Sequence, residues 1–127
     1  MQIKKNIAIL LSEDTEIISK CVEAAEAINC ELRIKFDIAE IILELQENHY
    51  NFVVFDCCDK NPDCINWIKV IKKIKTKLPM IIISNDVEIN AGAKFYELNI
   101  FNLFSSQESK ELLVEIFTAA VNYSYAK

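Results

Sequence analysis

Short apolar runs alternate with longer amphipathic stretches along the whole chain. Five runs are continuously apolar or alternate with a period of two, which predicts strands over about residues 6–11, 31–36, 52–55, 80–83 and 100–104. Five stretches carry apolar residues at helical spacing, which predicts helices over about residues 15–28, 38–47, 64–77, 87–98 and 108–122. Parallel strands joined by crossover helices form layers, so this alternation predicts a three-layer α/β sandwich.

Boundary residues and strand patterns refine these elements. Ser12 or Asp14 can cap the first helix, because a side-chain oxygen at this position accepts hydrogen bonds from free backbone N–H groups. Residues 80–83 are apolar throughout, as expected for a central strand that is buried on both faces. The second strand alternates instead, which predicts inward side chains at Leu32, Ile34 and Phe36.

The composition fits one globular domain and argues against two classes of nucleotide site. The chain has 127 residues, of which 52% are hydrophobic, so we expect one core and a single domain over residues 1–127. Gly92 is the single glycine of the sequence. Dinucleotide and P-loop sites need glycine-rich turns that let the backbone approach phosphate groups, so we expect neither site.

The net charge of −5 indicates which partners the surface repels. Nucleic acids and anionic membranes are negatively charged, so we expect the protein to bind neither. No apolar run approaches the roughly 18 residues of a membrane span, and the first residues do not resemble a signal peptide, so we expect a cytoplasmic protein. One group of lysines has the spacing of a solvated helix face rather than a binding patch: Lys69, Lys72, Lys73, Lys75 and Lys77.

The cysteines do not have the spacing of a zinc site. Their number is odd and no secretory signal precedes them, so we expect free thiols in a reducing compartment. Cys21 and Cys30 occupy apolar positions and should be buried. The one histidine, His49, lies in a polar connection, where we expect no functional role. The other cysteines lie around the turn after the third strand, at Cys57, Cys58 and Cys64.

Asp56 ends the third predicted strand and is the first candidate for a functional residue. The carboxyl ends of parallel strands meet at one edge of an open sheet, where such folds place their sites. Carboxylate and hydroxyl oxygens are ligands that suit Mg²⁺. The residues that follow the first, third, fourth and fifth strands should therefore converge: Ser12, Glu13 and Asp14, then Asp56, then Ser84 and Asn85, then Ser105 and Ser106.

Three segments of the sequence carry a resemblance to a known family. They are residues 7–17, Ile-Ala-Ile-Leu-Leu-Ser-Glu-Asp-Thr-Glu-Ile, residues 52–64, Phe-Val-Val-Phe-Asp-Cys-Cys-Asp-Lys-Asn-Pro-Asp-Cys, and residues 78–85, Leu-Pro-Met-Ile-Ile-Ile-Ser-Asn. Over roughly residues 5–120 the chain resembles the receiver domain of bacterial two-component response regulators. The resemblance implies a flavodoxin-like, receiver-type fold with five helices and a five-stranded parallel sheet in the order 2-1-3-4-5.

The resemblance also implies roles for particular residues. Asp56 matches the phosphoacceptor carboxylate, and Ser84 matches the switch hydroxyl that contacts the phosphoryl group. The implied Mg²⁺ ligands are Glu13, Asp56 and the backbone carbonyl of Cys58. A histidine kinase is the implied phosphodonor.

Three parts of the sequence depart from the family pattern, one of them the loop after Asp56, which has Lys60 and Cys64 in place of the usual Pro and Gly. Ser12 stands where the first metal-binding acid is expected, although Asp14 could substitute for it. The lysine expected after the fifth strand falls on Ser105 or Ser106, although Lys60 could reach the site from its loop. A charged partner contributes on the order of 1.5 to 3 kcal/mol, so we expect weak Mg²⁺ binding, low metal occupancy and weak or no phosphorylation.

These features predict a stand-alone receiver-like signalling domain, not an enzyme, that acts through protein–protein contacts. The partner or a second copy would bind through a face containing Phe95, Tyr96 and Phe101, unless Tyr96 and Phe101 complete the core. The alternative is a working receiver phosphorylated on Asp56. A redox switch between Cys57 and Cys58 is disfavoured, because adjacent cysteines form a strained ring and the nearby acids disfavour the thiolate.

Overall fold

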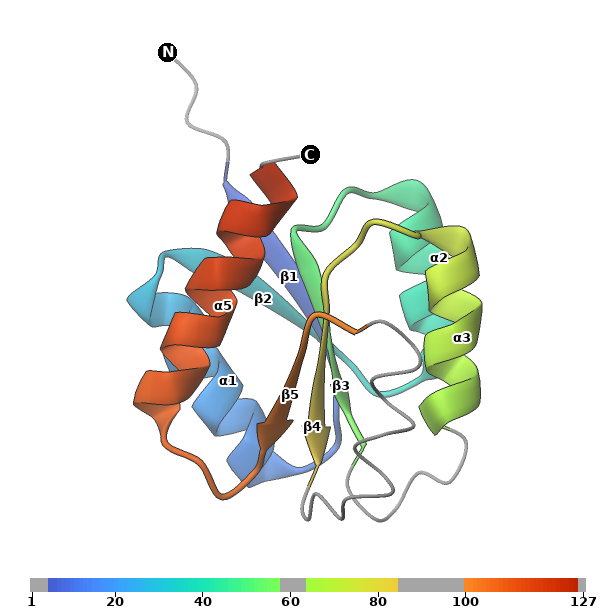
Figure 1. Ribbon diagram of the computed structural model, residues 1–127. Helices are drawn as coiled ribbons and strands as arrows, with labels where there is room; N and C mark the ends of the chain where they lie inside the picture. Colours follow the sequence, from blue (N-terminus) through green and yellow to red (C-terminus); the bar gives the residue numbers. More distant parts are fainter. Residues whose placement is uncertain (1–4, 58–63, 85–99, 126–127) are drawn as a thin grey trace.

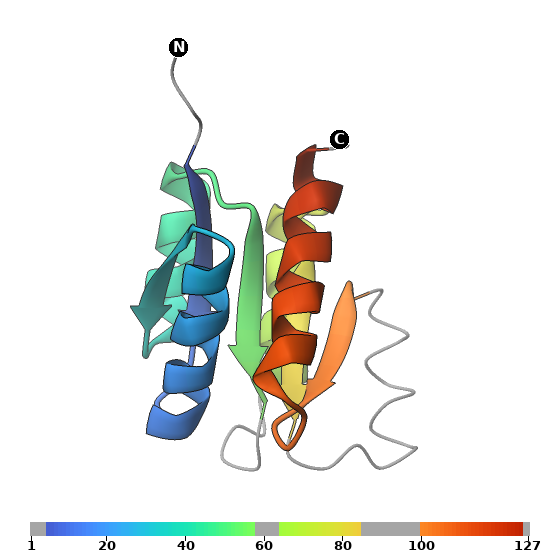
Figure 2. The same cartoon turned by 90° about the vertical axis from the view of Figure 1, so that its left-hand side faces the viewer.

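The protein is a three-layer α/β sandwich (Figures 1 and 2). The computed structural model describes residues 5–57, 64–84 and 100–125. Five parallel strands form one sheet in the order β2-β1-β3-β4-β5. Helices α1 and α5 cover one face, and α2 and α3 cover the other. The predicted fold class and strand order are therefore confirmed.

The described elements lie close to the predicted ones. The strands are β1 (Asn6–Leu11), β2 (Cys30–Lys35), β3 (Phe52–Asp56), β4 (Met80–Ser84) and β5 (Asn102–Ser105). The helices are α1 (Thr15–Ala27), α2 (Ile38–Glu47), α3 (Cys64–Ile74) and α5 (Lys110–Tyr125). The helix predicted over residues 87–98 lies outside the described residues.

Aspartate side chains fix the beginnings of α1 and α2. Asp14 Oδ1 accepts hydrogen bonds from the backbone N–H groups of Glu16 and Ile17, at 2.9 and 3.2 Å. Asp37 Oδ1 accepts a bond of 2.8 Å from the N–H group of Ala39. Each cap satisfies backbone donors that the first helical turn leaves without intrahelical partners.

The core consists of two apolar clusters, one on each face of the sheet. Every residue of β3 and β4 is buried, as expected for central strands of a parallel sheet. Alternate β3 side chains enter different clusters: Phe52 packs with α1 and α5, and Phe55 packs with α2 and α3. Phe52 also contacts Phe117 of α5, with ring centroids 4.8 Å apart.

Phe36 does not complete the second strand as predicted. The strand ends at Lys35, which is the last residue of β2 in register with β1, and 62% of the Phe36 surface is exposed. Leu32 and Ile34 do pack against the core, although both are only partly buried. The alternating pattern extends beyond the last strand pair, which explains why it placed Phe36 inward wrongly.

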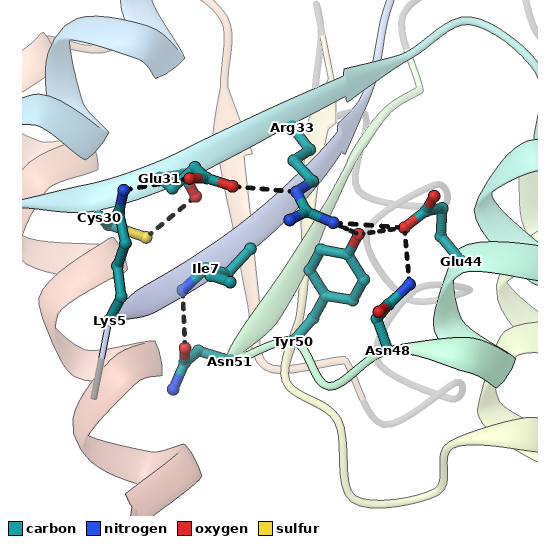
Figure 3. Close-up of polar contacts among 9 residues, drawn as sticks. All are labelled: Lys5, Ile7, Cys30, Glu31, Arg33, Glu44, Asn48, Tyr50 and Asn51. Atoms are coloured by element: carbon teal, nitrogen blue, oxygen red, sulfur yellow. Dashed lines mark hydrogen bonds and ion pairs between the residues drawn. The ribbon is translucent and has the colours of Figure 1, made fainter. Parts of the chain in front are cut away.

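Polar side chains link the edge strand β2 to α2 and to the beginning of β3 (Figure 3). Glu31 forms ion pairs with Lys5 at 3.1 Å and with Arg33 at 2.9 Å. Arg33 also donates a 3.2 Å hydrogen bond to the Tyr50 hydroxyl, which in turn donates to the Glu44 carboxylate. The charged groups of Glu31, Arg33 and Glu44 thus share partners along the outer edge of the sheet.

Asn51 joins three elements at the amino ends of the strands. Its side-chain oxygen accepts a 2.9 Å hydrogen bond from the Ile7 N–H group, as Figure 3 shows. Its side-chain nitrogen donates a 2.9 Å bond to the Ser124 hydroxyl in α5. Since only 3% of Asn51 is exposed, water has little access to these groups.

The lysines on α3 and just after its end are largely solvated, as predicted. Lys69, Lys73, Lys75 and Lys77 are exposed, and Lys72 is half-buried. Burial lowers the pKa of Lys72. Among the described residues, no helix has both the length and the apolar character needed to cross a membrane.

We expect Phe52→Ala to lower the free energy of unfolding by about 3 to 5 kcal/mol, because it removes a buried ring and leaves a cavity. Phe36→Ala is the control, and its effect should stay within about 0.5 kcal/mol because Phe36 is exposed. Urea denaturation measures both values. Equal losses for the two variants would contradict the described burial.

We expect Asn51→Ala to lower the free energy of unfolding by about 1 to 3 kcal/mol, because the buried Ile7 N–H group loses its acceptor. The exposed Asn48 provides a control, and Asn48→Ala should cost clearly less. Thermal and urea unfolding of both variants test this difference. If Asn51→Ala proves neutral, the side chain does not join the elements energetically.

Candidate functional site

Asp56 lies at the carboxyl end of the central strand β3. The sheet places this end beside the ends of β1 and β4, because Phe55 pairs with Leu11 and Asp56 pairs with Ile83. Ser12 follows Leu11 directly, and its backbone N–H donates a 3.2 Å bond to the carbonyl of Lys35. The sheet thus brings Ser12, which follows β1, close to Asp56 at the end of β3, as predicted.

Ser12 binds Asp56 directly. The Ser12 hydroxyl donates a buried hydrogen bond of 2.7 Å to Asp56 Oδ2, although the two residues are 44 positions apart in the sequence. The same hydroxyl oxygen accepts a 3.1 Å bond from the Asp14 N–H group. Only 4% of Ser12 and 7% of Asp56 is exposed. The neutral hydroxyl of Ser12 therefore contacts the buried Asp56 carboxylate, at the position where the family pattern implies a metal-binding acid.

Asp14 has a different role from the one considered for it. Its carboxylate caps α1, and the residue is exposed. Substituting for the missing acid would require this carboxylate to turn away from the helix N-terminus, where its charge is favourable. The second charge near Asp56 is therefore not supplied by Asp14 in the described structure.

Ser84 lies at the end of β4 and is 8% exposed. It pairs with Ser105 of β5, and its backbone carbonyl accepts a 2.9 Å bond from the Ser106 N–H group. Cys57 makes the equivalent bond on the other side, from its N–H group to the Ile83 carbonyl at 2.7 Å. The ends of β3, β4 and β5 are thus joined through backbone hydrogen bonds.

Lys20 is a charged residue near the carboxyl ends of the strands, and the sequence pattern did not identify it as a site residue. Its ammonium group extends from α1 and donates hydrogen bonds to the carbonyls of Ser106 at 2.8 Å and Glu108 at 2.9 Å. It also lies 5.9 Å from the centre of the Phe104 ring. Lys20 has the spacing of an ordinary polar helix residue, so only the fold relates it to the loop after β5.

The described side chains bring one buried carboxylate, that of Asp56, to the implied Mg²⁺ site. No three His, Cys, Asp or Glu residues gather closely enough to hold a metal within residues 5–57, 64–84 and 100–125. Glu13 is exposed, and Asp56 Oδ2 already accepts a hydrogen bond from Ser12. Mg²⁺ keeps several of its waters and is usually bound through one or two carboxylates, so Glu13 or the Cys58 carbonyl would have to add to Asp56 as the resemblance implies. Cys58 lies outside the described residues, so the implied ligand set stays a prediction.

The prediction of free thiols is wrong for two of the cysteines. Cys57 and Cys64 form a disulfide, with their Cα atoms 5.9 Å apart. Cys57 follows β3 and Cys64 begins α3, so the strand-to-helix connection brings together residues that are seven positions apart. The hypothesis of a switch between adjacent cysteines chose a different pair, and Cys58 lies outside the described residues.

Cys21 and Cys30 are free and buried, as predicted. Burial is the main reason that the pKa of Cys21 is raised to about 12, and the negative charge of Asp56 contributes further. Burial likewise raises the pKa of Cys30 to about 11, with a smaller effect of Glu31. Both groups are therefore neutral thiols at pH 7. His49 is exposed in its connection.

The aromatic face predicted for partner binding is only partly described. Phe101 is half-buried, packs against the core and contacts Tyr123 of α5, with ring centroids 5.4 Å apart. Tyr123 is 39% exposed. Phe95 and Tyr96 lie outside the described residues. For Phe101, the arrangement favours the alternative that its ring completes the core.

Comparisons with known proteins relate the chain to others through its fold. No protein-family model matches the sequence, and no curated protein matches it. Solved structures do match over nearly the whole chain. A CheY-like response regulator receiver domain protein from Methanospirillum hungatei JF-1 has 14% sequence identity and a TM-score of 0.83, with 97% of this chain and 98% of the other covered.

Two further structures give the same result. A response regulator from Thermotoga maritima has 12% identity and a TM-score of 0.84, with 94% of this chain and 99% of the other covered. The signal receiver domain of an HD domain-containing protein from Pseudomonas fluorescens Pf-5 has 13% identity and a TM-score of 0.85, with 99% of this chain and 93% of the other covered. The chain therefore has the fold of response regulator receiver domains.

Proposed function

We propose that this protein is a cytoplasmic receiver-like signalling domain that acts mainly through protein–protein contacts and accepts phosphoryl groups weakly or not at all. The observation that carries this proposal is the buried hydrogen bond from Ser12 to Asp56. An aspartate is a weak nucleophile and needs charge nearby to bind and orient a phosphodonor. At Asp56, the described neighbour that follows β1, Ser12, supplies a hydroxyl and no charge.

The loop after β5 supports the same proposal. Ser105 and Ser106 occupy the place where the family pattern implies a lysine. Within the part of the chain that the structure describes, a cation near this loop is that of Lys20, whose ammonium group binds two of the loop's backbone carbonyls. A lysine held by carbonyl groups stabilises the loop but is not aimed at a phosphoryl group on Asp56.

The second candidate function is that of a working receiver phosphorylated on Asp56 by a histidine kinase with Mg²⁺. The placement of Asp56 and Ser84 at neighbouring strand ends favours it, because an acceptor carboxylate and a switch hydroxyl need this proximity. The two candidate functions predict different rates for the phosphorylation of Asp56. A small phosphodonor therefore distinguishes them without knowledge of the kinase.

For the contact surface, we propose the side of the domain formed by β5 and α5. The exposed ring of Tyr123 and the half-buried ring of Phe101 contact each other there. Aromatic side chains contribute much of the binding energy at protein interfaces because they bury large apolar areas. The partner is a second copy of the chain or another signalling protein.

We expect incubation with a small acyl phosphate and Mg²⁺ to label Asp56 slowly. Each missing charge should slow the reaction by about 10-fold to 100-fold, the rate equivalent of 1.5 to 3 kcal/mol. Ser12→Asp should raise the labelling rate by about tenfold, because it adds a carboxylate that can bind the cation. Intact mass spectrometry over time measures the fraction of labelled protein.

Two control variants separate this effect from others. Ser12→Ala removes the hydrogen bond without adding charge, so it should not reproduce the gain of Ser12→Asp. Asp56→Asn should abolish labelling if Asp56 is the acceptor. Rapid and complete labelling of the unchanged protein would contradict the first candidate function and support the second.

We expect Phe101→Asp and Tyr123→Asp to weaken protein association by about tenfold or more, because a charge at an apolar contact is costly to desolvate. Phe36→Asp is the matched control, since it adds the same charge to an exposed ring beyond β2. Sedimentation measures self-association, and affinity capture with quantified partners measures heteromeric contacts. Unchanged oligomeric state and partners in both variants would contradict the proposed surface.

A further inference from the structure

Two cysteines frame the segment that follows Asp56. Cys57 is the next residue after Asp56, and Cys64 is the first residue of α3. Their disulfide connects the end of the central strand β3 to the beginning of α3. Helix α3 covers the same face of the sheet as α2 (Figure 1). Both side chains belong to the apolar cluster beneath α2 and α3. The fold itself therefore holds these two sulfur atoms together.

We propose that Cys57 and Cys64 form a reversible thiol–disulfide pair, a site of oxidative modification that controls the mobility of the strand end carrying Asp56. The proposal does not depend on whether Asp56 accepts a phosphoryl group. It requires only that the two thiols react with each other and that the strand end responds.

A peroxide is the oxidant, and the reaction has two steps. The Cys57 thiol gives up its proton and its sulfur attacks one peroxide oxygen; the O–O bond breaks and the departing hydroxide takes up the proton, so a sulfenic acid and one water form. The Cys64 thiol then attacks the sulfenic sulfur, which forms the S–S bond and releases a second water. Two thiols and one hydrogen peroxide thus give one disulfide and two waters. A dithiol reductant reverses the modification by thiol–disulfide exchange.

The burial of the two residues assigns these separate roles. Cys57 is partly exposed, so a small peroxide can reach it first, whereas only 4% of Cys64 is exposed. The Cα atoms are 5.9 Å apart, which lies within the usual range for a disulfide, so the backbone need not rearrange to form the bond.

The two buried thiols provide an internal comparison. Cys21 and Cys30 have raised pKa values, so they carry little of the reactive thiolate. They belong to the cluster on the other face of the sheet, which separates them from the Cys57–Cys64 pair. A mild peroxide should therefore leave both of them as free thiols.

The disulfide acts on Asp56 through the backbone. Cys57 bonds to the Ile83 carbonyl at the end of β4, one residue before Ser84. Asp56 bonds through its side chain to Ser12 at the end of β1. Oxidation fastens this strand end to α3, and reduction leaves it held by the sheet and by the hydrogen bond from Ser12. The redox state thus changes how firmly one edge of the site is anchored.

Peptide mapping of the full chain after treatment with equimolar hydrogen peroxide tests the modification. Trypsin cleaves after Lys35, Lys60 and Lys69, so a Cys57–Cys64 bond links the peptides of residues 36–60 and 61–69. We expect this linked pair, a loss of about 2 Da relative to the reduced chain, and free Cys21 and Cys30. A bond confined to the 36–60 peptide, or no bond, would overturn the proposal.

Cys58→Ser is the matched control, because it removes the adjacent thiol and keeps the proposed pair. It should still give the linked peptides, whereas Cys57→Ser should not. Loss of the link in Cys58→Ser would show that Cys58 is the reacting residue and would overturn the assignment. The comparison uses only variants of Cys57 and Cys58, so it does not require a substitution of the buried Cys64.

Two measurements on the unchanged chain test the response of the strand end. Reduction should lower the melting temperature by on the order of 5 to 10 °C, because it removes the constraint of a closed loop. Amide NMR signals of Ser12, Asp56 and Ser84 should shift on reduction, while those of the α5 residues Phe117 and Ala120 stay nearly unchanged. Unchanged signals at all three site residues would overturn the control of Asp56.

Discussion

The burial of β3 and β4 on both faces is the constraint on which the rest of the structure depends. Helices must cover the two sides of these strands, because neither side tolerates water. The strand ends then become the places where polar groups can lie at the centre of the sheet. Asp56 is such a group, and its burial requires hydrogen-bond partners from the neighbouring elements. The geometry of the site follows from how the core is built.

The strand order was predicted only from the resemblance to receiver domains. The alternation of apolar runs was sufficient to predict the strands, the helices and their three layers, because period and length distinguish buried strands from amphipathic helices without knowledge of tertiary contacts. It failed at Phe36, where the pattern continues past the last pairing of β2 with β1. A periodic pattern reports which side chains share a face. It does not report where the neighbouring strand ends, and that depends on two distant segments.

The sequence predicted where several site residues lie, but not which side chains contact one another. Asp56, Ser12 and Ser84 could be placed at one sheet edge because parallel strands have aligned ends. The bond between Ser12 and Asp56 depends on side-chain rotamers, and the contact of Lys20 with the loop after β5 depends on helix packing. Neither leaves a signal in sequence spacing. The Cys57–Cys64 bond was not predicted because the odd number of cysteines indicated free thiols, and sequence spacing does not show that the end of β3 and the beginning of α3 lie within disulfide distance.

The polar network around Glu31, Arg33 and Tyr50 has a consequence for how this domain can meet other proteins. Edge strands offer unpaired backbone groups to which a foreign strand can add. A strand that added to β2 would have to displace water from Lys5, Glu31 and Arg33, whose charges line that edge. The sheet therefore discourages its own extension by strand addition on this side.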